Sequence, residues 1–179
     1  MPPLLIIITG LPAAGKTTLA TALGAQLHLP VVSKDDYKQV LLDLMPEDER
    51  LIRNSEAGKA SYFVMLKVAE VLLTAGQSLI METHFYRGIS ELNIIPVADH
   101  HQARVLQIFC DAGIEELKRR HAARVAAQTR PYIDHPNIHD RLPEHANWEP
   151  LDLMAPLLRV NTALPNARSE ALTWLAQWG

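Results

Sequence analysis

Cysteine is almost absent from this 179-residue sequence, which contains only Cys110. A single cysteine excludes an internal disulfide, so the sequence fits a protein that works in a reducing compartment. Long hydrophobic runs are also absent, and the apolar start at residues 4–8 is far shorter than the ~20 residues of a membrane-spanning helix. No basic region precedes this run and no small-residue cleavage site follows it. We therefore expect no membrane anchor, no signal peptide and a cytoplasmic location.

Positive charge is in short supply as well. The sequence has 17 Lys and Arg against 20 Asp and Glu, a net charge of -3 and a pI near 6.2. This balance argues against a surface that coats nucleic acid. Aromatic residues make up only 6%, and none alternate with basic residues as they do in single-strand-binding surfaces. Hydrophobic residues, at 48%, are plentiful and indicate a folded chain with a sizeable core.

The hydrophobic pattern predicts strands that alternate with helices. Strands are expected at residues 4–8, 30–33, 78–81, 104–110 and 157–160. Helices are expected at residues 15–27, 34–45, 47–75, 89–101, 114–127 and 167–178. In the helix over 34–45, Val40, Leu41 and Leu44 form the predicted buried face. Such alternation predicts an α/β fold, a single domain over residues 1–179 whose parallel sheet has helices on both faces.

The strongest motif is a phosphate-binding loop at residues 10–17, Gly-Leu-Pro-Ala-Ala-Gly-Lys-Thr, between a predicted strand and a predicted helix. Its two glycines allow torsions with which backbone N–H groups point at phosphate oxygens, and the helix that follows adds its positive end. Lys16 is expected to reach the β- and γ-phosphates, and Thr17 to bind Mg²⁺. A chance glycine turn is the alternative. The candidate nucleotide-binding residues here are Gly10, Leu11, Pro12, Ala13, Ala14, Gly15, Lys16, Thr17 and Thr18.

Two further stretches complete a resemblance to a known group. Residues 33–38 read Ser-Lys-Asp-Asp-Tyr-Lys, and residues 111–124 combine a strand end with an arginine-bearing helix. With the loop at 10–17, they resemble small P-loop kinases of the nucleoside-monophosphate-kinase-like group. The similarity is greatest to domains grouped with polynucleotide 5′-hydroxyl kinase, zeta toxin and chloramphenicol phosphotransferase. It implies a three-layer P-loop NTPase fold with a five-stranded parallel sheet in the order 2-3-1-4-5, a lid over roughly residues 114–150, and ATP and Mg²⁺ as cofactors.

The resemblance also implies catalytic roles. Asp35 would accept the proton of the acceptor hydroxyl, Arg124 would stabilise charge on the transferred phosphoryl group, and Arg120 would lie over the adenine or the phosphates. The position of Asp35 after a strand agrees, because open α/β sheets bind substrates at that edge. On the residues alone, Asp36 is an alternative base, and one of the two aspartates is expected to cap the following helix. For the arginines the alternative is a solvated basic stripe that pairs with acidic neighbours.

The sequence departs from the family pattern at Glu82, where many relatives have an aspartate that holds Mg²⁺ through water. Glu82 either fills this role or is a buried structural residue. His135 and His139 have helix-like spacing that invites a zinc site, but Pro136 breaks the helix and no cysteine accompanies them. We therefore expect lid residues that contact the substrate, with Arg130 as a second phosphate clamp.

The sequence as a whole predicts a kinase that moves the γ-phosphoryl group of Mg·ATP to a hydroxyl of a small molecule. The helical region at 50–75 is the expected acceptor-binding element. Lys38 either contacts an anionic acceptor or is a solvated helix lysine. One alternative function is a polynucleotide 5′-hydroxyl kinase, which the Asp-Asp-Tyr-Lys element supports and the acidic balance opposes. The other is an ATP-dependent switch or ATPase module without an acceptor.

Overall fold

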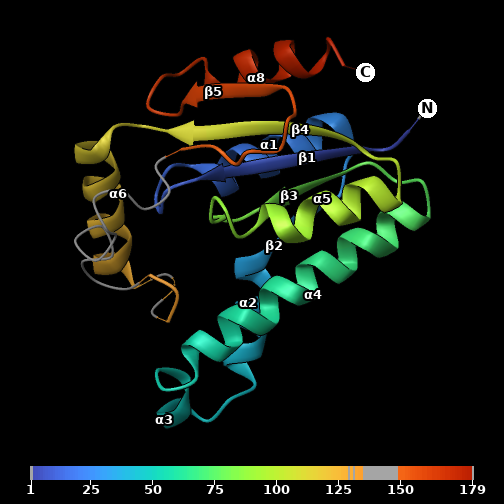
Figure 1. Ribbon diagram of the computed structural model, residues 1–179. Coiled ribbons are helices and arrows are strands. Elements are labelled where there is room, and N and C mark those ends of the chain that lie inside the picture. The colour runs from blue at the N-terminus through green and yellow to red at the C-terminus, as the bar shows by residue number, and fades with distance from the viewer. Residues whose placement is uncertain (1, 129, 131, 135–148, 179) are drawn as a thin grey trace.

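A computed structural model describes residues 2–128, 130, 132–134 and 149–178 (Figure 1). Within these residues, five strands form a parallel sheet in the order β2-β3-β1-β4-β5. The strands are β1 (Leu4–Gly10), β2 (Val31–Ser33), β3 (Leu79–Glu82), β4 (Arg104–Asp111) and β5 (Leu157–Asn161). The α/β class and the strand order implied by the sequence are confirmed.

Helices cover both faces of this sheet. The helices in the described residues are α1 (Lys16–Leu27), α2 (Lys34–Asp43), α3 (Glu47–Arg50), α4 (Asn54–Thr74), α5 (Glu91–His100), α6 (Ile114–Ala127) and α8 (Ala167–Leu175). One hydrophobic cluster joins α1 and α8 to the sheet, and a second joins α4 and α5 to the opposite face. The prediction of a single helix over 47–75 is wrong, because a turn at residues 51–53 separates α3 from α4. No proline or glycine lies at residues 51–53, so no helix-breaking signal marks the interruption.

Strand β1 lies in the middle of the sheet, between β3 and β4. Ile6 and Ile8 point into the cluster on the α1 side, while Leu5 and Ile7 belong to the cluster on the α4 side. A strand that is buried on both faces needs an apolar residue at every position, which explains its unbroken hydrophobic run. The loop that follows β1 therefore starts from a fixed, fully buried point.

The buried face of α2 differs from the prediction. Val40 is 59% exposed and Leu44 is 79% exposed, whereas Lys38 and Leu42 are the buried residues of this helix. The helix packs against α4 through a face that contains a lysine. The apolar residues of α2 therefore do not mark its buried face.

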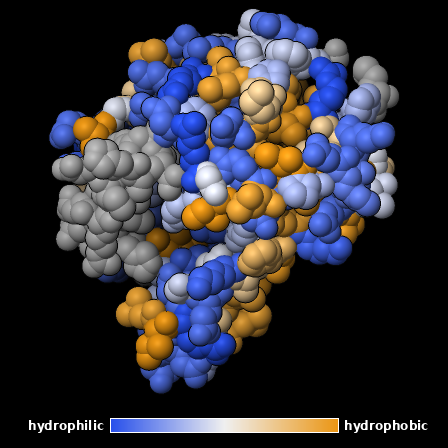
Figure 2. All heavy atoms as spheres, in the orientation of Figure 1, coloured by the Kyte–Doolittle hydropathy of each residue, from blue (hydrophilic) through white to orange (hydrophobic). Residues whose placement is uncertain are grey.

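The carboxyl ends of the strands point toward α6, which stands beyond this edge of the sheet (Figure 1). Helices α2 and α3 and the start of α4 form an arm that projects from the body, and Figure 2 shows hydrophobic residues near its tip. Those with the largest exposed fractions are Leu44, Leu51 and Ile52. In the part of the chain that the structure describes, no helix has both the length and the apolar character to cross a membrane.

Candidate active site

The loop between β1 and α1 has a backbone that few side chains would tolerate. Gly10 has φ 147°, and a Cβ at this position would lie 2.2 Å from the carbonyl oxygen of Cys110 on β4. Ala13 and Gly15 have φ values of 67° and 74°. Alternation into the left-handed region creates the concavity of N–H groups that binds anions, and α1 begins directly afterwards. The local geometry is that of a phosphate cradle.

Lys16, the first residue of α1, is 9% exposed. Its Nζ donates a hydrogen bond to the carbonyl of Leu11 at 2.9 Å, which folds the side chain over the loop. Burial lowers the pKa of Lys16, and the nearby carboxylates of Glu82 and Asp35 act in the opposite direction. A phosphate placed in the loop would add further negative charge beside this ammonium and favour its protonated form.

Glu82 ends β3 and is 3% exposed. Its Oε2 accepts hydrogen bonds from Ser33 Oγ at 2.9 Å and from Thr17 Oγ1 at 3.2 Å. Burial raises the pKa of Glu82, while Lys16 and the two hydroxyls lower it. A hydroxyl at the start of α1 that meets a buried carboxylate supplies the oxygen ligands that Mg²⁺ prefers. Thr17 and Glu82 could therefore hold this ion together with a nucleotide.

We also searched the described residues for a cluster of metal-binding side chains. Among the residues that the structure describes, no group of three or more His, Cys, Asp and Glu side chains converges as a metal site. This does not conflict with Mg²⁺, which usually takes one or two protein oxygens and completes its shell with phosphates and water. The zinc interpretation of His135 and His139 falls outside the described residues.

The prediction that Asp35 or Asp36 caps α2 is wrong. Helix α2 begins at Lys34, so both aspartates lie in its first turn. Ser33 stands at the cap position, but it makes no side-chain cap bond because its hydroxyl donates to Glu82. Asp35 lines a cleft beside the phosphate loop, whereas Asp36 is exposed and does not line it.

The carboxylate of Asp35 is surrounded by cations. Lys34 Nζ lies 3.5 Å from Oδ1, and Arg130 Nη1 lies 3.4 Å from Oδ2. Burial raises the pKa of Asp35, but Lys34, Arg130 and Lys16 together outweigh it and hold the pKa below its usual value. Asp35 is thus ionised at neutral pH and able to accept a hydrogen bond from a hydroxyl.

Arg124 belongs to a chain of alternating charges that joins α6 to α2. Its Nη2 lies 3.1 Å from Asp134 Oδ1, Asp134 also pairs with Arg130 at 3.2 Å, and Arg130 reaches Asp35. Burial lowers the pKa of Arg124, and Asp134 opposes that change. Within the described residues, Arg124 Nε is buried without a hydrogen-bond partner. Part of this guanidinium therefore retains capacity for a ligand.

Arg120 is anchored to the phosphate loop through Thr162, which follows β5. The guanidinium donates to Thr162 Oγ1 and to the Thr162 carbonyl, both at 3.1 Å, and pairs with Glu116 at 2.7 Å. Thr162 Oγ1 in turn lies 3.0 Å from the carbonyl oxygen of Ala14. Arg120 does pair with an acidic neighbour, but it is not a solvated residue, since its side chain is 26% exposed. Arg119, whose side chain is 71% exposed, is the more solvated of the two arginines.

His84 braces the other side of the loop. With the ring neutral, Nδ1–H donates to the carbonyl of Gly10 at 3.0 Å, and the ring meets the edge of Tyr86. Burial lowers the pKa of His84 to about 4, and the positive charge of Lys16 adds to this effect. The imidazole is thus neutral at physiological pH. His84 also lines the cleft.

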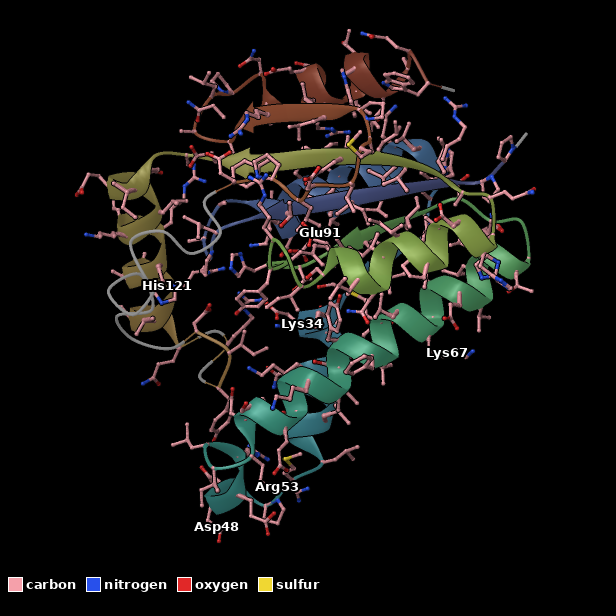
Figure 3. The ribbon with its side chains drawn as sticks, in the orientation of Figure 1. Lys34, Asp48, Arg53, Lys67, Glu91 and His121 are labelled. Atoms are coloured by element: carbon pink, nitrogen blue, oxygen red, sulfur yellow. The ribbon has the colours of Figure 1, made fainter. Side chains whose placement is uncertain are left out.

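These groups surround one cleft of about 960 Å³ at the carboxyl edge of the sheet. Figure 3 shows its two sides, with Lys34 on α2 and His121 on α6. Of the predicted site residues, Pro12, Ala13, Gly15, Lys16, Thr17, Thr18, Asp35, Glu82, Arg120 and Arg124 line it. Gly10, Leu11 and Ala14 lie behind its surface and shape the loop. The sequence did not single out Thr162, whose contacts with Ala14 and Arg120 depend on the fold.

Comparisons with known proteins agree with this geometry. A family model described as an AAA domain matches residues 5–140. A solved structure from Chloroflexus aurantiacus, provisionally described as a kinase, is 32% identical, with 98% of this chain and 95% of that chain covered and a TM-score of 0.84. No curated protein matches the chain.

More distant structures share the fold. The APS kinase of Mycobacterium tuberculosis, solved with AMPPNP and APS, has a TM-score of 0.64 at 15% identity, with 98% of each chain covered. A gluconokinase from Sinorhizobium meliloti has a TM-score of 0.58 at 15% identity, with 99% of this chain and 94% of that chain covered. The fold is therefore that of P-loop kinases.

Proposed function

Because the chain belongs to the AAA domain family and has a P-loop kinase fold, we propose that it is an ATP-dependent phosphotransferase with a small hydroxyl-bearing acceptor. The observation that carries the proposal is the convergence of Lys16, Asp35 and Arg124 on one cleft. A phosphate cradle alone fits any P-loop ATPase. An ionised carboxylate beside the cradle also gives an acceptor hydroxyl a place to bind.

Each side chain has a task in this reaction. The loop and Lys16 hold the β- and γ-phosphates, and Arg124 neutralises charge that develops on the transferred group. Asp35 accepts a hydrogen bond from the acceptor hydroxyl and orients its oxygen toward the γ-phosphorus. Mg²⁺, when bound at Thr17 and Glu82, would neutralise phosphate charge. Positioning and electrostatics then carry most of the catalysis, as in other phosphoryl transfers.

Two competing functions have less support. A polynucleotide acceptor requires a basic surface that continues beyond the cleft, and the net charge of -3 disfavours it. A switch or ATPase without an acceptor requires a group that positions water for attack. Asp35 lines the cleft beside the phosphate loop, at the strand edge where open α/β sheets bind substrates, and this supports an acceptor hydroxyl.

The test is transfer of labelled γ-phosphate from ATP to a panel of small alcohols and 5′-hydroxyl oligonucleotides. Binding of Mg·AMPPNP is measured in parallel, and a reaction without Mg²⁺ is the control. We expect a phosphorylated small molecule and no phosphorylated oligonucleotide. Failure to bind Mg·AMPPNP would sink the proposal. Rapid ATP hydrolysis that no acceptor diverts would favour the ATPase alternative.

Glu82→Gln tests the assignment of the metal-binding carboxylate. The amide keeps the size and can still bond Ser33 and Thr17, but it removes the negative charge that would face Mg²⁺. We expect the Mg²⁺ concentration for half-maximal activity to rise about tenfold, in line with losses on changing groups that support a metal. Activity measured against Mg²⁺ concentration checks this. An unchanged Mg²⁺ requirement with a lowered melting temperature would mark Glu82 as purely structural.

A further inference from the structure

The cleft wall beside Asp35 contains a buried lysine that the proposed reaction does not use. Lys38 lies three residues after Asp35 in α2, so both side chains fall on the same helix face. Only 8% of Lys38 is exposed, although lysine is among the residues least often buried. The interpretation of Lys38 as a solvated helix lysine is therefore wrong. Its place in the cleft lining needs another explanation.

The ammonium of Lys38 has a neutral partner. Its Nζ donates to Asn54 Oδ1 at 2.7 Å, and Asn54 Nδ2 donates to the carbonyl of Tyr132. Within the described part of the chain, Lys38 forms no ion pair. An ammonium has three donors, so two N–H groups remain for another ligand. Asn54 fixes where they lie without cancelling their charge.

Positive charge exceeds negative charge around this lysine. Burial and the nearby cations Lys34 and Arg130 together lower the pKa of Lys38 to about 8, and only Asp35 opposes them. The carboxylate of Asp35 is already shared by Lys34 and Arg130. Burying a charge without a counterion costs stability, and such groups in clefts tend to belong to binding sites. A negatively charged ligand would supply the counterion that the described residues do not provide.

We propose that Lys38, oriented by Asn54, binds an anionic group of the acceptor, with Arg130 as a second cation beside it. The acceptor is then a small hydroxy acid: one molecule that bears both the reactive hydroxyl and a carboxylate, phosphate or sulfate. This inference rests on the proposed function, because Asp35 holds the hydroxyl. Side chains three residues apart on a helix have Cβ atoms about 5–6 Å apart. Lys38 and Asp35 also interact electrostatically and line the same cleft, so one small molecule can contact both.

The first test uses inorganic sulfate as the probe and needs no knowledge of the acceptor. Sulfate is titrated calorimetrically into protein saturated with Mg·AMPPNP, which occupies the phosphate loop. We expect the wild type to bind sulfate and Lys38→Met to bind it about 10- to 100-fold more weakly, the loss expected for a charge-assisted hydrogen bond. Methionine matches the length of the lysine stem and suits the buried site, and Lys38→Arg keeps the charge and should retain part of the binding.

Lys67→Met is the matched control, because it removes the same charge from a side chain of α4 that is 74% exposed. It should bind sulfate like the wild type. Equal affinity in Lys38→Met and Lys67→Met would overturn the anion site, as would a loaded wild type that takes up no sulfate at tens of millimolar. Failure of the AMPPNP loading step would instead count against the proposed function, so the two failures are distinguishable.

The second test compares acids with their neutral counterparts as acceptors: glycerate and glycerol 2-phosphate against glycerol, and gluconate against sorbitol. We expect transfer to an acid of the panel, with kcat/KM reduced about 10- to 100-fold in Lys38→Met. The carboxylate and phosphate compounds identify which anion is preferred. Equal use of a neutral alcohol and its acid, unaffected by Lys38→Met, would overturn the inference while leaving the kinase proposal intact.

Discussion

Asp35→Asn is expected to reduce kcat about 10²- to 10⁴-fold, the range associated with loss of a general base. The amide has the same shape but cannot accept the hydroxyl proton. Mg·AMPPNP should bind at least as well as before, because the phosphate loop is untouched and one negative charge near it is gone. Steady-state kinetics with an acceptor, combined with a nucleotide titration, checks both parts.

Asp36→Asn is the control for this prediction. It makes the same chemical change one residue away, at an exposed position that does not line the cleft. Its kcat should stay close to that of the wild type. Equal losses in the two variants would assign the effect to the fold of α2 rather than to a base. A larger loss in Asp36→Asn would exchange the two roles.

Arg124→Ala is expected to lower kcat about 10³-fold, at the lower end of what an arginine supplies to phosphoryl transfer. The loss should fall mainly on kcat, because this guanidinium neutralises charge that appears as the phosphoryl group moves. Asp134, its ion-pair partner, keeps Arg130 as a neighbour, so the variant should fold. Single-turnover measurement of the transfer step is the direct readout.

Lys118→Ala serves as the control on the same helix. Lys118 is exposed and does not line the cleft, so we expect kcat to be unchanged. If Arg124→Ala raises KM for ATP and leaves kcat intact, Arg124 binds the nucleotide in its ground state. The role in the transition state would then be wrong.

The sequence predicted the features that depend on neighbouring residues and missed those that depend on distant ones. The phosphate loop depends on adjacent residues, and the parallel sheet depends on short apolar runs such as that of β1. The site contacts depend on residues brought together from distant parts of the chain. The hydroxyl of Ser33 meets Glu82 only because β2 pairs with β3. A local rule for helix starts assigned the cap of α2 to Asp35 or Asp36. That prediction was wrong, because α2 begins at Lys34, before both aspartates.

Other misses concern side chains whose surroundings are set by tertiary packing. The sequence left Lys38 open between a contact with an anionic acceptor and a solvated helix lysine, and only the fold shows that α2 presents it to α4 and the cleft. Thr162 carries no motif, and its contacts with Ala14 and Arg120 span 148 and 42 positions. No period or propensity encodes such pairs, so a fold is needed to find them.

The tight packing beneath the phosphate loop also means that the reactivity of Cys110 can report separation of strands β1 and β4. Cys110 is 1% exposed on β4, beside Gly10, and burial raises the pKa of its thiol to about 12. Thiol reagents attack the thiolate, so this sulfur is chemically silent while β1 and β4 remain paired. It becomes reactive only when the centre of the sheet separates. Because the sequence has no second cysteine, the rate of alkylation reports that single event without any engineered label.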